Sequence, residues 1–309
     1  MTSAPTATPL AEARPILLTD WREREAAHTA RVTELTAPRR YRAERRLTDP
    51  VEDFLWDYYS LKPRHLTRWH HGAGFSIPDD GDLGWRTTAR WARWLPAVDG
   101  ETRALTLDTE AYLRDRGSDV GRLETLLEAT AGRAPRFACF GWHEWAMVYR
   151  QGEHRHPLPL RLGQVGTDAA VEAADLKCTH YDAFRFYSPA ARPLNAQPLT
   201  RETQPEFEQP GCLHANMDLL KAALLLGPAC PGELLLDAFE LARRIRILDM
   251  AASPYDCSEL GLEPVRIETP AGRAEYVARQ REFAAESAPV RERLLEVIGR
   301  VGVARAQVE

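Results

Sequence analysis

The stretch 212–250, CLHANMDLLKAALLLGPACPGELLLDAFELARRIRILDM, decides the fold class of this chain. Its first part predicts a helix that begins near His214 and stops at Gly227, because glycine commonly lies just past the end of a helix. Its second part predicts another helix that begins at Pro231, since proline is tolerated in the first helical turn. Two further helices are predicted near 270–286 and 289–299, each introduced by a Thr or Ser cap and a proline. The last third of the chain is therefore predicted to be helical.

Upstream of these helices the sequence mixes helical and strand patterns. A helix is predicted from Asp20 to about Leu35, and an amphipathic helix over 118–131 with Ser118 as its N-cap. The segment 175–188, DLKCTHYDAFRFYS, has the composition and the alternating character of a β-strand. A mixed middle region followed by a helical end favours an α+β fold over a doubly wound sheet.

The chain is long enough to bury a full hydrophobic core. It has 309 residues, and its hydrophobic fraction of 44% and charged fraction of 28% are ordinary for a globular protein. Residues 1–15 are small, Pro-rich and polar, which is typical of a disordered tail. Residues 16–309 are predicted to form one principal domain, and position 211 marks a weak alternative boundary.

Charge and targeting signals narrow the class of protein. The formal net charge is −5, whereas a dedicated non-specific DNA-binding protein would normally carry a basic balance, so any nucleic-acid contact is expected to be local. The five cysteines lie far apart and form no CxxC pair. The sequence begins with no signal-peptide pattern and contains no apolar stretch that approaches eighteen residues. We therefore expect a soluble cytoplasmic protein that does not span a membrane.

Two N-terminal segments concentrate cationic side chains. The run APRRYRAERR at 37–46 carries five arginines and is interpreted either as a solvated arm or helix face or as an arm that contacts phosphate. The segment 51–75 combines aromatic and cationic residues, which suggests stacking or anion binding, because arginine and aromatic faces both pair with planar groups. The alternative is a half-buried helix that ends at Pro63, followed by a polar turn. The side chains in question are Arg64, His65, Arg68, His70 and His71.

Side chains suited to catalysis or ligand binding are most concentrated between residues 137 and 216. Five of the nine histidines lie between positions 143 and 214. A single histidine on an apolar background is usually a hydrogen-bonded core residue, but several that cluster with carboxylates indicate a site. This segment is therefore predicted to supply a polar, catalytic site.

One interpretation of this segment is acid–base catalysis without a metal. Desolvation favours the neutral form of a carboxylate in an apolar and aromatic setting, which suits proton transfer or stabilisation of a cationic transition state. The alternative for the string WHEW at 142–145 is a core helix with one satisfied His–Glu pair. The candidate catalytic residues are His143, Glu144, His180 and Asp182.

Aromatic and cationic side chains of the same region are candidates for substrate binding. Aromatic rings are suited to stack on a flipped nucleobase, and arginines are suited to hold phosphate. For Arg185 the default alternative is a structural ion pair. The stacking candidates are Trp142, Trp145, Tyr149 and Tyr181, the cationic candidates are Arg150, Arg155, Arg161 and Arg185, and His214 is a further candidate for substrate contact.

A second interpretation is a metal site made of His180, Asp182 and His214. An H-x-D pair on a strand points both side chains to one face, and a third histidine from elsewhere would complete a 2-His-1-carboxylate set. Such a set suits iron or zinc and leaves coordination positions open for substrate or oxygen. It would make the protein a metal-dependent oxygenase or hydrolase that acts on a small molecule.

Five strings spread along the chain carry a family resemblance. They are VEDFLWDYY, FGWHEWAMVYR, THYDAFRFYSPAARPLN, QPGCLHANMDL and ELARRIRILDMAASPYD, and the similarity covers about residues 30–285. Together they resemble a bacterial, largely actinobacterial family whose members are commonly labelled 3-methyladenine DNA glycosylase. The resemblance implies DNA repair by base flipping and hydrolysis of the glycosidic bond of alkylated purines.

The chain departs from the helix-hairpin-helix glycosylases. Those enzymes place a Gly-rich hairpin between helices and a catalytic Asp roughly one helix later, whereas the nearest hairpin-like string here, VIGRVGVARA, lies at 297–306. No catalytic residue is therefore carried over from them, and the candidate site residues are those derived from the side chains above.

Three functions stay open at the level of sequence. The first is an enzyme that acts on DNA or on a nucleobase-like small molecule without a cofactor, most specifically an alkylpurine DNA N-glycosylase. The second is the metal-dependent oxygenase or hydrolase, with iron or zinc as its cofactor. The third is a non-enzymatic nucleic-acid-binding protein that uses the arginine-rich run 37–46. We rank an enzyme first, because polar residues crowd one segment where a simple binding scaffold would not require them.

Overall fold

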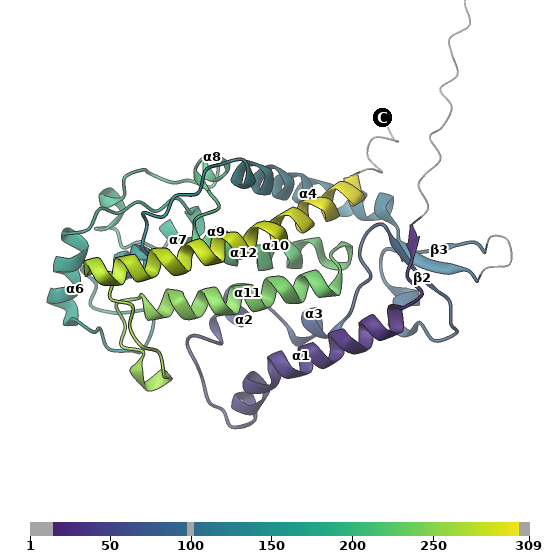
Figure 1. Cartoon of the computed structure of the whole chain (residues 1–309), viewed down its shortest axis with the longest axis horizontal. Helices are drawn as coiled ribbons and strands as arrows, with labels where there is room; N and C mark the ends of the chain where they lie inside the picture. Colours follow the sequence, from purple (N-terminus) through teal and green to yellow (C-terminus); the bar gives the residue numbers. More distant parts are fainter. Residues whose placement is uncertain (1–14, 98–101, 303–309) are drawn as a thin grey trace, which may run out of the picture.

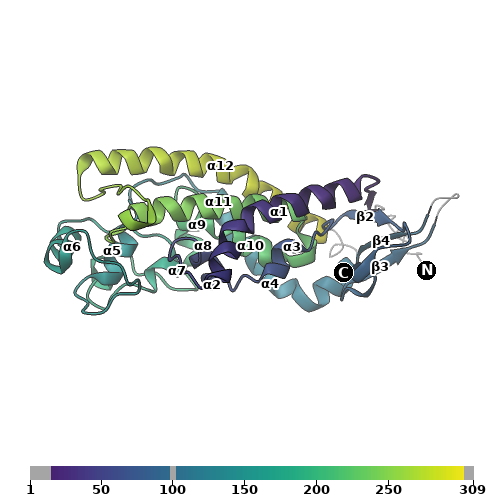
Figure 2. The ribbon, with the colours of Figure 1, turned by 90° about the horizontal axis from the view of Figure 1, so that it is seen from below.

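The structure, a computed structural model, describes residues 15–97 and 102–302. It confirms the predicted α+β class, since helices dominate and one small mixed sheet lies at one end of an elongated molecule (Figures 1 and 2). The predicted N-terminal tail falls on residues 1–14, outside the described ranges, and on Pro15. Within the described residues no helix combines the length and the apolar composition needed to cross a membrane.

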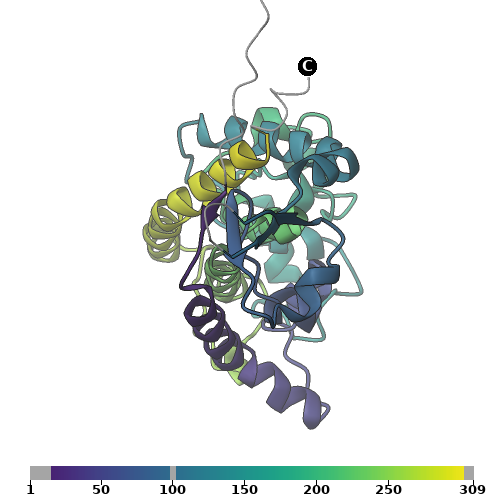
Figure 3. The ribbon, with the colours of Figure 1, turned by 90° about the vertical axis from the view of Figure 1, so that its right-hand side faces the viewer.

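The sheet has four short strands in the order β1-β2-β4-β3. β1 pairs with β2 in parallel, and the other two pairings are antiparallel, with Ser76 opposite Thr106 and Trp94 opposite Leu105. Its buried side chains pack with two stacked indoles, Trp21 and Trp69, whose ring centroids are 6.3 Å apart. Figure 3, seen from this end, shows the sheet in front of the helices. The strands are β1 (Ile16–Leu17), β2 (Phe75–Pro78), β3 (Ala92–Leu95) and β4 (Ala104–Leu107).

The helical body contains four long helices and several short ones. The long helices are α1 (Trp21–Glu44), α4 (Thr109–Ala131), α11 (Gly232–Ala251) and α12 (Pro270–Gly302). The short helices are α2 (Phe54–Tyr58), α3 (Pro63–Thr67), α5 (Trp142–Val148), α6 (Gly163–Glu172), α7 (Tyr181–Phe184), α8 (Gln204–Phe207), α9 (Leu213–Met217) and α10 (Leu219–Leu226). Single 3-10 turns are η1 (Gly84–Thr88), η2 (Arg192–Leu194), η3 (Gly227–Ala229) and η4 (Ser258–Leu260).

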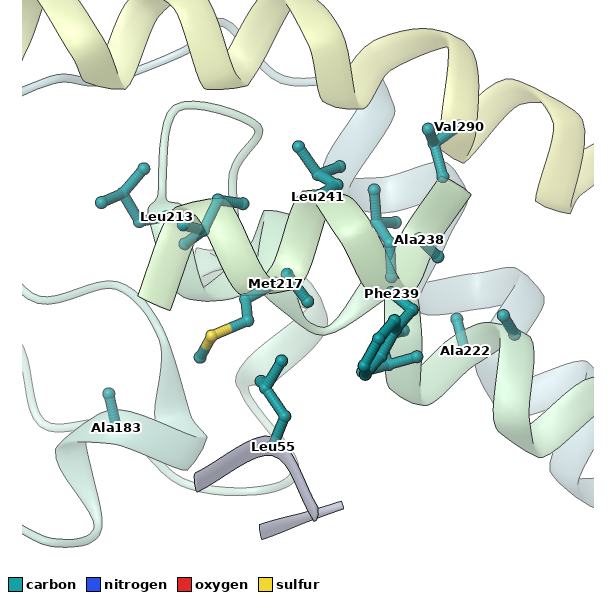
Figure 4. Close-up of a cluster of buried hydrophobic side chains, with 14 of the residues drawn as sticks. Leu55, Ala183, Leu213, Met217, Ala222, Ala238, Phe239, Leu241 and Val290 are labelled. Carbon is teal, nitrogen blue, oxygen red and sulfur yellow. The ribbon is translucent and has the colours of Figure 1, made fainter. Parts of the chain in front are cut away.

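α11 lies at the centre of this body and is buried along most of its length. α12 runs beside it, and α9 and α10 pack against it (Figure 1). Phe239 of α11 and Leu55 of α2 belong to the main cluster of buried apolar side chains, which runs from Val32 to Val301 (Figure 4). The stretch predicted to decide the fold therefore forms the middle of the core, and the predicted end of its first helix at Gly227 is confirmed.

Two helices continue through prolines where the sequence predicted an end. The helix predicted to stop near Leu35 runs on through Pro38, and the two helices predicted near 270–286 and 289–299 are one helix, α12, with Pro289 inside it. Proline costs about 3 kcal/mol within a helix, but packing of a long apolar face outweighs a local propensity. In α12 that face includes Val290, Leu294 and Val297.

The predicted boundaries in the middle of the chain are also corrected. The helix predicted over 118–131 begins at Thr109, and Asp108 caps it by accepting a hydrogen bond from the Ala111 N–H, so Ser118 is not its cap. Residues 175–188 form no strand, because after one bridge at Leu176 the chain turns into the short helix α7. The alternation in this segment reflects alternate burial in a loop and helix, which a period of two does not distinguish from a strand.

The loop 68–74, which leads into the sheet, forms backbone hydrogen bonds with the turn between α10 and α11. The Ala73 N–H donates to the Ala229 carbonyl, and the Gly232 N–H donates to the His70 carbonyl, both at 2.9 Å. Gly72 has a φ of +87°, and an added Cβ would lie 2.6 Å from Cγ of Pro231. Only glycine therefore fits the backbone where the loop meets this turn.

Acid is expected to destabilise the protein through His71. Burial first, and then the charge of Arg86, lowers the pKa of His71 to about 4. The unfolded chain takes up this proton near pH 6.5 and the folded chain does not, so this part of the stability is present above about pH 6.5 and is lost as the pH falls towards 4. In urea unfolding at pH 7 and pH 5, His71→Gln should lose less stability than the wild type. His154→Gln serves as the control, and equal losses in all three proteins would contradict the expectation.

Candidate functional site

The buried helix α5 begins directly after a tight turn. Gly141 precedes the helix with a φ of +76°, and an added Cβ would lie 3.1 Å from the ring of Tyr276, so this close approach requires glycine. All but one residue of α5 are buried, which confirms that WHEW belongs to a core helix. His143 and Glu144 therefore lie inside the protein, where polar groups need partners.

Those partners come largely from α11. Arg246 and Asp249, three positions apart on this helix, are both about 1% exposed. Nη1 of Arg246 donates to Oδ2 of Asp249 at 2.6 Å and to Oε1 of Glu144 at 3.0 Å, and Nη2 lies 3.4 Å from Nε2 of His156. The ring of Phe54 covers the guanidinium at 3.9 Å. A buried arginine thus neutralises one carboxylate of α5 and one of α11.

His143 of α5, His214 of α9 and Asp249 of α11 converge on one another. Nε2 of His143 lies 3.0 Å from Oδ1 of Asp249, and Nε2 of His214 lies 3.8 Å from Oδ2 of the same carboxylate. The two imidazole centroids are 4.1 Å apart. The side chains of His143 and Asp249 are 6% and 0% exposed, whereas that of His214 is 14% exposed. The centre therefore reaches solvent mainly at His214.

The donor atoms of this centre fit a divalent metal ion. Nε2 of His143 and Oδ1 of Asp249 are buried, and they lie 3.0 Å from each other as an ion pair that lacks the alignment of a hydrogen bond. Two ligand atoms that bind one octahedral metal at about 2.1 Å lie about 3.0 Å apart. With His214 the set is two imidazoles and one carboxylate, all within 4.8 Å of one another.

The electrostatics keep His214 and Asp249 in the protonation states that metals bind. Burial first, and then the neighbouring His143, lowers the pKa of His214 well below its ordinary value, so its imidazole is neutral at pH 7. Burial alone would raise the pKa of Asp249, but His143, His214 and Arg246 together lower it below its usual range. A neutral imidazole and an ionised carboxylate are ligands, whereas their protonated forms are not.

A second buried group lies beside the first and centres on His180. Its Nδ1 lies 2.9 Å from Oε2 of Glu208, and its Nε2 lies 3.6 Å from Oδ2 of Asp218. The Tyr59 hydroxyl donates to Oδ1 of Asp218 at 2.7 Å. Burial alone would lower the pKa of His180, but Glu208 and Asp218 outweigh it and raise the pKa. The His180 ring is 5.7 Å from that of His214, so the two groups adjoin.

Cationic side chains contact the carboxylate of Asp182. Lys221 and Arg201 each lie 2.6 Å from its oxygens, and Arg185 lies 3.2 Å away. Burial alone would raise the pKa of Asp182, but the hydrogen bonds from Lys221 and Arg201 lower it to about 2. The carboxylate is thus ionised and neutralised, which suits charge balance at the mouth of the site better than proton transfer.

The predicted metal triad of His180, Asp182 and His214 is divided between two groups. His180 and Asp182 lie together with Asp218, as one set within 4.8 Å, while His214 belongs with His143 and Asp249. The strand that was to align His180 with Asp182 is absent, and the turn at the start of α7 brings them together instead. His180 has a carboxylate near each ring nitrogen, at 2.9 Å and 3.6 Å, and the closer contact resembles that between Nε2 of His143 and Asp249 at 3.0 Å.

Half-buried aromatic rings and arginines surround the outer side of the site. Phe54 stacks on Tyr58 with centroids 5.0 Å apart, and Tyr58 meets Phe186 at 6.5 Å. The guanidinium of Arg155 lies 4.9 Å from the Phe186 ring, and that of Arg185 lies 4.3 Å from it. Arg155 and Arg185 were predicted to hold phosphate, and this rim places both beside an aromatic ring.

Several predicted substrate-binding residues lie away from this rim. Trp142 and Trp145 are 5% and 0% exposed and pack edge to face, and the Trp145 indole donates to the Ala252 carbonyl. Tyr149 and Arg150 both donate to Glu172 of α6. The two tryptophans thus present no free ring face to a base and stabilise the core. The remaining candidates are Arg161, which pairs with Glu268, and Tyr181, which lies under Arg201.

The sequence interpretation missed Arg246, Asp249, Glu208, Asp218 and Lys221. A signal for the first two was present, because the helical period places Arg246 and Asp249 on the same apolar stripe as Leu235, Ala242 and Ile245. A charged pair on the buried face of a helix is a candidate site. Glu208 lies in an irregular stretch after α8, where no periodicity marks burial.

Comparison of the chain with protein families, with curated proteins and with solved structures finds no match in any of the three. The glycosylase resemblance stays a prediction, and the geometry of the side chains carries the functional argument.

Proposed function

We propose that this protein is a metal-dependent enzyme that binds one iron or zinc ion through His143, His214 and Asp249 and acts on a small molecule. The observation that carries the proposal is the buried pair of ligand atoms, Nε2 of His143 and Oδ1 of Asp249, which lie 3.0 Å apart without an aligned hydrogen bond, next to the neutral imidazole of His214. Two imidazoles and one carboxylate are the ligand set of non-heme iron oxygenases, which favours iron. Three protein ligands leave positions open for a substrate or for oxygen.

The residues around the triad have distinct proposed roles. Arg246 holds Oδ2 of Asp249 and so leaves Oδ1 free to point at a metal, as partners of ligating carboxylates commonly do. A bound metal would supply Lewis-acid or redox chemistry at its open positions. His180, between Glu208 and Asp218, carries a proton close to His214 and is placed to deliver or accept one at a substrate atom there.

The rim supports a planar or anionic substrate. Tyr58 and Phe186 supply aromatic surface, since the Phe54 ring is covered by Arg246 and Tyr58, and Arg155 and Arg185 supply positive charge beside Phe186. Arg185 and Lys221 also neutralise Asp182, so this carboxylate does not oppose an anionic substrate. A small aromatic or conjugated acid would meet both ring stacking and charge attraction.

Metal content is the direct test of the proposal. Untagged protein purified without chelators is expected to carry about one iron or zinc ion per chain by elemental analysis, and chelated protein is expected to regain one ion by calorimetric titration. Thermal unfolding should shift to higher temperature when the ion is added, because an ion that binds only the folded state stabilises it. Chelated protein that binds neither iron(II) nor zinc(II) at micromolar concentration would refute the proposal.

The same chelated protein distinguishes the metal enzyme from the alkylpurine glycosylase that the family resemblance implies. Hydrolysis of a glycosidic bond by acid–base catalysis needs no metal, so release of base from methylated DNA by chelated protein would favour the glycosylase over the metal enzyme.

A further inference from the structure

A large cavity lies on the other side of Tyr59 from the histidine centre. It has a volume of about 830 Å³, which is within the range of small-molecule sites. α3, η1, β3 and β4 form one part of its wall, and the end of α10 forms another. Of the residues placed in the two buried groups above, Tyr59 is the one that also lines this cavity. The cavity is therefore a separate place in the fold.

The charge on its wall is of one sign. The lining residues include four arginines and no aspartate or glutamate, and the three lining histidines are neutral at pH 7 because burial lowers their pKa values. This is notable in a chain with a net charge of −5. Arg64 and Arg68 are exposed, and within the described residues no carboxylate lies at ion-pair distance from either of them. Arg86 and Arg90 pair with Glu25 and Asp115, so the unneutralised charge of the wall is that of Arg64 and Arg68, and positive charge in a concave site attracts anions.

Two buried lining groups have hydrogen-bonding capacity left over. Arg86 is 6% exposed; one of its terminal nitrogens pairs with Glu25, while its Nε has no partner within the described residues. Nε2 of His71 is likewise buried without a partner there. Both atoms are buried, so an anion in the cavity would meet the exposed guanidinium groups of Arg64 and Arg68 and not these two atoms.

The rest of the wall suits a flat apolar group. Leu105, Leu107 and Leu235 line one part of the cavity. Trp85 also lines it, half-buried, with the guanidinium groups of Arg68 and Arg86 at 5.1 Å and 4.9 Å from its ring. An indole flanked by two guanidinium groups matches a planar ring that carries an anionic group.

We infer that this cavity is a binding site for a small aromatic phosphate, with the phosphate on the arginine wall and the ring against Trp85 and the leucines. The inference does not rest on the proposed metal site, since it uses other residues. It gives a structural basis to the anion binding that the segment 51–75 suggested.

Calorimetric titration with 1-naphthyl phosphate tests this inference. The wild type is expected to bind the probe with a dissociation constant below about 1 mM. Both 1-naphthol, which lacks the charge, and inorganic phosphate, which lacks the ring, should bind at least about tenfold more weakly. Each of them loses the contacts with one part of the cavity wall, either the arginines or the apolar side chains. The double variant Arg64→Gln/Arg68→Gln should also bind at least about tenfold more weakly; both side chains are exposed, so folding should persist.

Two controls keep the result specific. Arg122→Gln removes an exposed arginine of α4 that pairs with Asp119, and it should bind like the wild type. His214→Ala, which removes a proposed metal ligand, should also bind the probe normally, so failure of one proposal is distinguishable from failure of the other. Equal binding of naphthyl phosphate and naphthol, or wild-type binding by the double variant, would overturn the inference.

Discussion

Replacing His214 with alanine is expected to lower the bound metal from about one ion per chain to less than about a tenth, because two protein ligands seldom hold a labile divalent ion. His214 is well suited to this test. In the structure it contacts His143, His180 and Asp249 but makes no side-chain hydrogen bond within the described residues. Its removal should therefore leave the unfolding temperature of the metal-free protein within a few degrees of the wild type. Elemental analysis and thermal unfolding of chelated samples measure the two quantities.

His154→Ala is the matched control for His214→Ala. His154 lies in the same part of the sequence and contacts Gln164 and Tyr255, away from the triad. This variant should keep its metal. Full metal occupancy in His214→Ala, or equal loss in both variants, would show that the triad does not hold the ion.

The second large effect is expected at Arg246. Arg246→Met keeps the length of the side chain but leaves Glu144 and Asp249 buried without their cation, and breaking a buried pair in this way costs about 3–5 kcal/mol. Arg246 is 1% exposed and both carboxylates are 5% exposed or less, so water offers little compensation. Urea unfolding of the chelated protein measures the loss of stability.

Arg243→Met provides the comparison for Arg246→Met, one helical turn away. Arg243 pairs with Glu52 at 2.9 Å, but its side chain is 23% exposed, so the loss should be below about 1 kcal/mol. Adding iron(II) or zinc(II) should restore part of the stability of Arg246→Met, because a cation at Asp249 replaces some of the missing charge. Equal losses in the two variants, with no effect of the metal, would contradict the role given to Arg246.

The two proposed sites explain different parts of the charge distribution. The histidine centre buries several carboxylates and balances them with Arg246, Lys221 and Arg201. The cavity beyond Tyr59 presents Arg64 and Arg68, which pair with no carboxylate within the described residues, while Arg86 and Arg90 pair with Glu25 and Asp115. Neither of these two sites requires an arginine-rich protein surface that binds DNA. The run 37–46 forms the last turns of α1 and the residues after it, where Arg42 pairs with Asp53 and Arg39 lies over Trp56.

The sequence interpretation listed His143, His180 and His214 as candidates without showing whether they meet in space, and the structure places the His214 ring beside the rings of the other two. They could be listed because histidines and carboxylates are rare on apolar segments unless a site requires them. The grouping of those residues was predicted incorrectly, since it rested on a strand over 175–188. A turn of α7 can bring two side chains together as closely as a strand face, and local composition does not separate the two.

The sequence by itself determined the α+β class and the helical last third, and it indicated the segment that supplies His143, His180 and His214. These follow from local quantities: helical periodicity, capping residues and the clustering of titratable side chains. Only the tertiary structure decided that Asp249 and Arg246 complete the centre, that Trp145 is core, and that loop and helix replace the expected strand. Each of those outcomes depends on which side chains, distant in the sequence, pack against a residue. Burial by such distant partners does not change the hydrophobic periodicity of the sequence around that residue, so the local pattern does not predict it.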